Sequence, residues 1–276
     1  MKTLLFLVVL SGEDKITLKD NVVHKTGFFL TELMVPLQKL VNNGYTPVFV
    51  TPNGTKPVMD AVSDSDFWFG GNQKEYQHYR QRCVELGLCG DGTVGTLKTQ
   101  SFSQVIESGF DQYAAVFFPG GHAPMEDLYR NKALGQILKH FHENKKPTAL
   151  ICHAPISLLS TLDNPEAFGR AVEEQDQDRI TKLRQGWIYN GYRMTTFSTK
   201  EEKQEEPGGS DNALGGFVRF YPDEALDFAG GHVLVRAQKW QSNVVKDREL
   251  ITGQNPFSDK EFANVLLGAM NERRHK

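Results

Sequence analysis

The chain has 276 residues, 39% of them hydrophobic and 24% charged, with a formal net charge of -3 and a pI of about 6.3. A chain of this length can bury one large core, so we expect a single domain. The sequence shows no cluster of basic residues, which argues against nucleic acid or an anionic membrane as partner. No apolar run approaches the ~20 residues of a membrane span.

The cysteines and the N-terminal run bear on location. Cys83, Cys89 and Cys152 are too few for a disulfide framework, and the spacing of the first two is not that of a zinc knuckle. Residues 4–10 are apolar like the core of a secretion signal, but residues 11–14 give no small-residue cleavage site. The run has the length of a buried parallel strand. We therefore expect a reducing compartment and a cytoplasmic location.

The first half of the chain alternates between strand and helix patterns. Apolar residues recur at spacings of three and four over residues 26–43, which indicates one face of a helix, and Pro36 should kink it. The predicted strands are 4–10, 47–51, 114–118 and 148–151, and the predicted helices are 26–43, 101–108, 131–144 and a start at 156–161. This order predicts a flavodoxin-like α/β fold, a doubly wound, mainly parallel sheet with helices on both faces.

The remaining segments are less regular. Residues 52–99, with the aromatic loop Phe67-Trp68-Phe69, are interpreted as an insertion over one sheet edge. Residues 168–187 are expected to be a charged variable loop, and residues 188–197 a strand pair around Asn190-Gly191. Short strands at 233–237 and 250–252 and a helix at 258–274 complete the chain. No repeat or linker divides it, so residues 1–276 are interpreted as one domain with insertions.

Residues 148–155 carry the strongest sign of chemistry. An apolar strand ends in Cys152-His153, and a helix start follows, as in a nucleophile elbow. A helix N-terminus and a neighbouring protonated imidazole both lower the pKa of a thiol. A cysteine at a strand end can also be inert packing, but the adjacent His153 favours a reactive thiol.

A second strand ends in Pro119-Gly120-Gly121-His122. In open α/β sheets, ligands bind at the carboxyl ends of the strands. If the two strands are neighbours, the backbone of Gly120 and Gly121 approaches the thiol without a side chain in the way. Their N–H groups, with that of His153, could then bind an oxyanion, and His122 would join the substrate-binding turn. The alternative is an ordinary tight turn.

These motifs, with Lys25-Thr26-Gly27 leading to Glu32 and the late Thr252-Gly253-Gln254-Asn255-Pro256, resemble the ThiJ/PfpI superfamily, which has the class I glutamine amidotransferase-like fold. More narrowly, the chain resembles the heat-shock chaperone and glyoxalase III branch, from Leu4 to about Leu267. The class I glutaminases carry Gly-x-Cys-x-Gly, whereas Leu150 and Ala154 flank the cysteine here. Amidotransferase chemistry is therefore not expected.

The resemblance implies roles for particular residues. Glu32 would lie against Cys152 and exchange a proton with the thiol or substrate, and burial would raise its pKa into the range of a general acid or base. The alternative is a surface carboxylate. An acid that orients His153 should follow residues 193–197. Glu202 is the first candidate and Glu201 the second, although residues 200–206 could instead be a solvated loop.

A metal site is not expected. Some members of this branch bind zinc through histidine and glutamate near the site, and His24, His122 and Glu32 are conceivable ligands. The sequence has no closely spaced metal motif, however.

The resemblance implies a glutathione-independent glyoxalase that converts methylglyoxal or a related 2-oxoaldehyde into a 2-hydroxy acid. No cofactor is required, because the redox change is internal to the substrate. We also expect a homodimer. Three alternatives stay open. One is a Cys-His-acid hydrolase, such as a deglycase, amidase or peptidase. The second is a stress-response holding chaperone that binds unfolded proteins through residues 67–69, and the third is a redox sensor.

Overall fold

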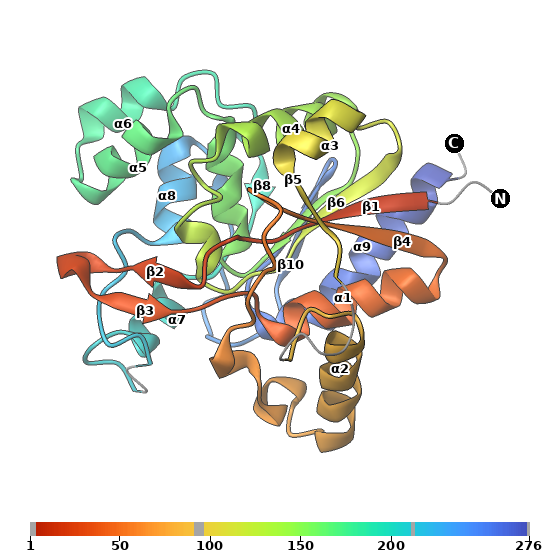
Figure 1. The fold of residues 1–276 in the computed structure, drawn as a ribbon. Helices are drawn as coiled ribbons and strands as arrows, with labels where there is room; N and C mark the ends of the chain where they lie inside the picture. The colour runs from red at the N-terminus through yellow and green to blue at the C-terminus, as the bar shows by residue number, and fades with distance from the viewer. Residues whose placement is uncertain (1–3, 91–96, 211–212, 275–276) are drawn as a thin grey trace.

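The computed structural model describes residues 4–90, 97–210 and 213–274. Its centre is a seven-stranded sheet in the order β10-β11-β7-β6-β1-β4-β5, in which β10 alone runs antiparallel to its neighbour (Figure 1). The strands are β1 (Leu4–Val9), β4 (Tyr45–Thr51), β5 (Thr99–Ser101), β6 (Tyr113–Phe118), β7 (Thr148–Ile151), β10 (Val244–Asp247) and β11 (Leu250–Gly253). The predicted mainly parallel α/β fold is confirmed.

Helices cover both faces of the sheet (Figure 1). Along β1, Leu7 and Val9 pack into one hydrophobic core, whereas Phe6 and Val8 pack into the other. A parallel strand buried on both faces reads as a continuous apolar run, which explains the composition of β1. One face carries α1 (Leu30–Asn42), α2 (Gln73–Glu85) and α9 (Asp259–Arg274), and the other carries α3 (Phe102–Ser108), α4 (Lys132–Glu143) and the 3-10 helix η5 (Ala154–Thr161).

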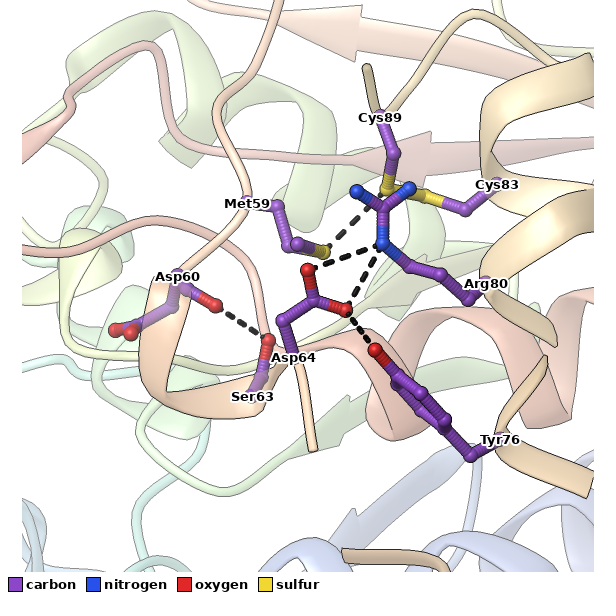
Figure 2. Close-up of a disulfide and its surroundings, with 8 residues drawn as sticks. All are labelled: Met59, Asp60, Ser63, Asp64, Tyr76, Arg80, Cys83 and Cys89. Atoms are coloured by element: carbon purple, nitrogen blue, oxygen red, sulfur yellow. Dashed lines mark hydrogen bonds and ion pairs between the residues drawn. A yellow bond between two sulfur atoms is a disulfide. The ribbon is translucent and has the colours of Figure 1, made fainter. Parts of the chain in front are cut away.

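Residues 52–98 connect β4 to its parallel neighbour β5, so the predicted insertion is the crossover at this edge of the sheet. It contains the 3-10 helices η2 (Ala61–Ser63) and η3 (Asp66–Phe69), followed by α2. Asp64 joins these parts, since its carboxylate accepts hydrogen bonds from Tyr76 and Arg80 of α2 (Figure 2). The segment is thus tied together by a partly buried polar contact and by a disulfide.

The cysteines were judged too few for a disulfide framework, but Cys83 and Cys89 form a disulfide, with their Cα atoms 5.2 Å apart (Figure 2). The chain turns back after α2, where Gly87 has a φ of 74°, and the N–H of Cys89 donates to the carbonyl of Cys83. The bonded sulfur of Cys89 lies 3.4 Å from that of Met59. Cys152 is the free cysteine. The cysteine content therefore no longer argues for a reducing compartment.

The C-terminal half departs most from the predicted elements. The segment at 168–187 was expected to be a loop but holds parts of two helices, α5 (Pro165–Glu173) and α6 (Gln177–Leu183), whose apolar residues Phe168 and Ile180 are buried. The hairpin predicted around Asn190-Gly191 is replaced by a parallel pair of two-residue strands, β8 and β9, from distant parts of the chain. The further elements are β2 (Lys15–Thr17), β3 (Val23–Lys25), β8 (Arg193–Met194), β9 (His232–Val233), α7 (Thr199–Glu205), α8 (Pro222–Ala229), η1 (Lys19–Asn21), η4 (Ala123–Met125) and η6 (Pro256–Ser258).

The charge run at 200–206 is not a solvated loop. It forms α7, in which Glu201 and Glu202 have no exposed surface. Within the described ranges, no helix is both long and apolar enough to cross a membrane.

Candidate active site

The chain makes a strained turn at Cys152, directly after β7. Cys152 has a φ of 63°, an uncommon conformation for a residue with a side chain. Its N–H donates to the carbonyl of Gly253 in β11 at 2.9 Å. Its carbonyl accepts hydrogen bonds from the N–H of Phe197 at 2.8 Å and from the hydroxyl of Thr196 at 2.7 Å. The neighbouring strand and residues 196–197 therefore hold the turn from both sides.

Cys152, His153 and Glu202 form a chain of hydrogen-bonding groups. The sulfur of Cys152 lies 3.2 Å from Nδ1 of His153. Nε2 of the same ring lies 2.7 Å from Oε2 of Glu202, which α7 carries into the interior. The His153 ring also stacks on Phe197, with centroids 4.4 Å apart. Of the two candidate acids, the structure places Glu202 against His153.

His122 is a fourth member of this group. Its Nε2 lies 2.7 Å from Oε1 of Glu202, so the turn after β6 directs this ring to the acid as well as to the pocket. Burial lowers the pKa of His122, but the charge and the hydrogen bond of Glu202, together with the charges of Glu205 and Asp60, outweigh it and raise the pKa to about 9. The pKa of His153 is lowered by burial and by the neighbouring His122 charge. Burial opposes the charge of Glu202, but the two imidazoles lower its pKa overall.

These shifts indicate one protonation state. A charged His122 pairs with ionised Glu202, and His153 is neutral. In that state, Nε2–H of His153 donates to Glu202, and Nδ1 is free to accept the proton of the thiol. This is the arrangement that a general base needs.

Glu32 reaches the site from the first turn of α1. The residue is fully buried, and its Oε2 accepts a hydrogen bond from the N–H of Gly120 at 3.1 Å. Burial is the largest cause that raises the pKa of Glu32 to about 8; the Cys152 thiol and the Gly120 N–H oppose it. A carboxyl group with this pKa can both give and take a proton near neutral pH.

The thiol is neutral in this structure. Burial raises the pKa of Cys152 well above its usual value, as does the negative charge of ionised Glu32; the N–H groups of Gly121 and His153 oppose this. The expectation of a thiol with a lowered pKa was therefore wrong. It assumed an exposed sulfur beside a charged imidazole, whereas Cys152 is 2% exposed and His153 is neutral.

The glycine turn lies against the thiol because β6 and β7 are neighbours in the sheet. A Cβ on Gly120 would come 2.4 Å from Cβ of Cys152 and 2.6 Å from Oε2 of Glu32. Gly121 has a φ of 94°, and a Cβ there would come 2.0 Å from the carbonyl oxygen of Gly27. Only glycine fits either position. This absence of side chains brings two backbone donors, Gly121 and His153, to the sulfur.

A small pocket opens to solvent at Cys152 and His153, and the space inside it and in its open mouth is together about 420 Å³. Phe29, Trp68, Phe197 and Trp240 contribute aromatic side chains to its lining, and Asp60 and Glu205 contribute carboxylates. Sequence reasoning did not connect Phe197, Trp240 or Asp60 with the site. Asp60 is connected to the motif Lys25-Thr26-Gly27 only in the folded chain, where its carboxylate accepts a hydrogen bond from the Thr26 hydroxyl.

His122, His153 and Glu202 are the three described residues whose ligand atoms are close enough to hold a metal ion, all within 4.8 Å of one another. Two ligands of one tetrahedral zinc ion lie roughly 3.3 Å apart. Each carboxylate oxygen of Glu202 lies only 2.7 Å from its imidazole nitrogen, which is a hydrogen-bond distance. The geometry therefore fits protons between these groups better than a metal. The set His24, His122 and Glu32 is not brought together among the described residues.

Comparison with known proteins identifies the family. The model of the DJ-1/PfpI family matches residues 21–164, which include Glu32, the glycine turn and the elbow. The chain belongs to the DJ-1/PfpI family. This confirms the resemblance seen in the motifs.

Curated relatives lie in one branch of the DJ-1/PfpI family. The protein/nucleic acid deglycase HchA of Staphylococcus aureus is 22% identical over 271 residues, which are 96% of this chain and 79% of that protein. HchA of Escherichia coli K12 is 26% identical over 161 residues, which are 58% of this chain and 47% of that protein. The chain thus spans about half the length of the Escherichia coli relatives it matches.

Two solved structures of similar fold extend the comparison. Glyoxalase III of Candida albicans is 18% identical, with a TM-score of 0.68 over 97% of this chain and 98% of that one. The rapid encystment protein REP24 of Francisella tularensis is 21% identical, with a TM-score of 0.67 over 97% of this chain and 99% of that one. At these identities the two structures show a shared fold.

Proposed function

We propose that this protein is a glutathione-independent glyoxalase that converts methylglyoxal or a similar 2-oxoaldehyde into the 2-hydroxy acid. One observation carries the proposal. Cys152 meets a proton acceptor, Nδ1 of His153 at 3.2 Å, and a buried acid, Glu32, whose pKa is raised to about 8. The similarity to glyoxalase III of Candida albicans and to HchA supports it.

In the first step, Nδ1 of His153 takes the thiol proton while the sulfur of Cys152 adds to the aldehyde carbon C1. A C–S bond forms, and the carbonyl π bond becomes an oxygen lone pair. The N–H groups of Gly121 and His153, which already act on the sulfur, are placed to stabilise this oxyanion. The proton on His153 then neutralises the oxygen and gives a hemithioacetal.

In the second step, ionised Glu32 takes the hydrogen of C1 as a proton, the electrons of that C–H bond form a C1=C2 double bond, and the C2 carbonyl oxygen becomes the oxyanion of an enediolate. The proton of the C1 hydroxyl passes to the C2 oxygen, and Glu32 returns its own proton to C2, which leaves a hydroxyl at C2 and a thioester carbonyl at C1. Water then hydrolyses the thioester, releases the 2-hydroxy acid and restores the thiol. The sum is substrate plus water, so no external oxidant or reductant takes part.

The test is 2-hydroxy acid formation from methylglyoxal without glutathione, in the wild type, Cys152→Ala and Glu32→Gln. We expect the product to disappear in both variants. The double variant Cys83→Ala/Cys89→Ala is the matched control, because it removes sulfur that does not line the pocket, and it should keep the activity. Wild-type rates in both site variants would refute the mechanism.

A second candidate is a cysteine hydrolase that acts on amine adducts of 2-oxoaldehydes, as the name of HchA suggests. The hydrogen-bonded series Cys152, His153 and Glu202 favours it, since a hydrolase needs an oriented base. Release of free amine from a purified adduct, faster than the adduct decays by itself, would support this function. The holding chaperone, the redox sensor, the homodimer and the cytoplasmic location stay predictions.

A further inference from the structure

Aromatic rings form a connected wall along one side of the pocket. The wall consists of Phe197, Trp240, Trp68 and Phe29, all of which line the pocket. Phe197 stacks on the His153 ring, and its centroid lies 5.7 Å from that of Trp240. Trp240 lies 6.0 Å from Trp68, which lies 4.9 Å from Phe29. The wall therefore runs without a break from Phe197, which stacks on the ring of His153, to the partly buried indoles of Trp240 and Trp68 and on to Phe29.

The wall offers ring surface rather than hydrogen bonds. The indole N–H of Trp68 donates to the carbonyl of Val62 at 2.8 Å, and that of Trp240 donates to Gln204 at 3.1 Å. Both N–H groups are thus satisfied by the protein itself. What remains for a ligand is apolar surface and the ring faces, which favour stacked or edge-to-face contact with another ring.

Trp240 is held in place by a buried carboxylate. The residue has a φ of 62°, a strained conformation for a large side chain. The backbone N–H of Trp240 donates at 2.9 Å to Oε1 of Glu201, which has no exposed surface. The same carboxylate accepts hydrogen bonds from Ser198, Gln254 and Asn255. Strain kept by such a network marks a position that the fold fixes.

The charged groups of the pocket disfavour a substrate with an anionic substituent. Among the described residues that line it, none is lysine or arginine, whereas Asp60 and Glu205 carry carboxylates. The charged His122 also lines the pocket, but it is already paired with ionised Glu202, so a carboxylate or phosphate on the substrate would meet no unpaired positive charge among these residues. A methyl group would leave most of the aromatic wall uncovered. An aryl group would cover it and displace water from it.

From these observations we propose that Trp240 and Trp68 make the site selective for 2-oxoaldehydes with an aryl substituent, of the phenylglyoxal type. The proposal rests on the proposed function and narrows it to a substrate class. The aldehyde group of such a substrate would lie at Cys152, where that of methylglyoxal would also react, and its aryl ring would lie on the aromatic wall.

The experiment compares kcat/KM for phenylglyoxal and methylglyoxal. We expect the wild type to prefer phenylglyoxal by on the order of tenfold or more, the size that apolar pocket contacts supply. Trp240→Ala should abolish that preference, because kcat/KM should fall further for phenylglyoxal than for methylglyoxal. Trp240→Phe, which keeps a ring, should restore most of it. Phe217→Ala is the control, since Phe217 is an exposed ring that does not line the pocket.

A binding measurement separates this inference from the proposed function. 2-Hydroxyacetophenone and hydroxyacetone differ by the same aryl and methyl groups but are not aldehydes, and quenching of tryptophan fluorescence reports their binding. Tighter binding of the aryl ligand, lost in Trp240→Ala, supports the inference even if neither aldehyde is turned over. Equal binding of the two ligands, or equal losses for both aldehydes in Trp240→Ala, would overturn it even if the glyoxalase activity is found.

Discussion

Oε2 of Glu32 lies 3.1 Å from the backbone nitrogen of Gly120, so the first helix and the turn after β6 meet beside the thiol. Both partners are buried, and neither position tolerates much change, because a Cβ on Gly120 would come 2.6 Å from this oxygen. The contact places an acid with a raised pKa next to a neutral nucleophile. The glycine thus helps to fix the position of Glu32, and its N–H opposes the rise in the pKa of this carboxyl group that burial causes.

The buried acid makes stability depend on pH. The pKa of Glu32 is about 8 in the folded state against a usual 4.5, so the folded state keeps a proton that the unfolded state releases. The free energy of unfolding therefore falls as the pH rises from about 4.5 to about 8, by up to roughly 5 kcal/mol. Glu32→Gln removes this dependence, since its amide does not titrate. We expect the variant to gain stability relative to the wild type as the pH rises, measured by urea denaturation at pH 5, 6.5 and 8.

Other buried acids do not confuse this comparison. Asp127 and Asp259 also have raised pKa values, of about 6 and about 7, but both titrate in the variant as in the wild type; what remains in the difference is Glu32 itself, including the part of its raised pKa that the charge of Asp259 causes. A constant difference between Glu32→Gln and the wild type at all three pH values would show that Glu32 is ionised throughout.

Glu202 should be the acid on which catalysis and the two imidazoles depend. Glu202→Gln leaves the His122 charge without its partner, so we expect a loss of about 3 kcal/mol of stability at pH 6. With Glu202 present, the pKa of His122 is raised from 6.5 to about 9, so its contribution is complete below pH 6.5 and is lost as the pH rises through 9. The stability difference between the variant and the wild type should therefore shrink toward pH 10. The rate with methylglyoxal should fall by about 10² to 10⁴, because His153 is no longer oriented.

Glu201→Gln is the matched control for this prediction. Glu201 is the neighbouring buried carboxylate, but it contacts Trp240, Ser198, Gln254 and Asn255 rather than a histidine. We expect it to keep most of the methylglyoxal rate and to show no change near pH 9. A larger loss of rate in Glu201→Gln than in Glu202→Gln would show that the two glutamates have been assigned the wrong way round.

Local patterns were enough to predict the elements that carry the nucleophile. The strand before Cys152 has the predicted bounds, since an apolar run that ends abruptly at a turn is a local signal. Glu202 was the first candidate acid because the family resemblance implies an acid after residues 193–197, and the structure places it 2.7 Å from His153. The alternation of strands and helices along the chain was likewise enough to predict the mainly parallel α/β fold.

What sequence reasoning missed depends on contacts between distant residues. The charge run at 200–206 left a solvated loop possible, because the burial of Glu201 and Glu202 is compensated by donors such as Asn255 and His122, far away in sequence. Trp240 lies in an irregular segment, and only the folded chain brings it to Trp68. The short strands β8 and β9 pair across nearly forty residues, which no local periodicity can indicate.

Gly120→Ala should separate the site from the rest of the fold. The added methyl group would overlap Cβ of Cys152 at 2.4 Å, and relief requires Cys152 or Glu32 to shift. We expect a loss of about 1–3 kcal/mol of stability from this overpacking and at least a hundredfold lower rate with methylglyoxal. Gly268→Ala is the control, because an exposed glycine in α9 with open space around its Cβ should be neutral or slightly stabilising. Near-normal activity in Gly120→Ala would mean that the turn is not close to the reacting atoms in solution.

The disulfide between Cys83 and Cys89 should stabilise the crossover without taking part in the chemistry. The bond closes a loop of six residues' separation, for which the loss of chain entropy in the unfolded state gives roughly 2 kcal/mol. We expect the double variant Cys83→Ala/Cys89→Ala to unfold at lower urea concentration than the oxidised wild type, by about that free energy. Addition of a reducing agent should lower the stability of the wild type toward that of the variant and leave the variant unchanged, since Cys152 is its remaining cysteine. A wild-type denaturation curve that is the same with and without the reducing agent would indicate that the two thiols are unpaired in solution.

The disulfide also lies near the edge of the pocket, because Met59 contacts Cys89 and adjoins the pocket residue Asp60. The same samples should therefore be assayed with phenylglyoxal. A small change in KM at constant kcat would show how far the disulfide fixes the pocket edge.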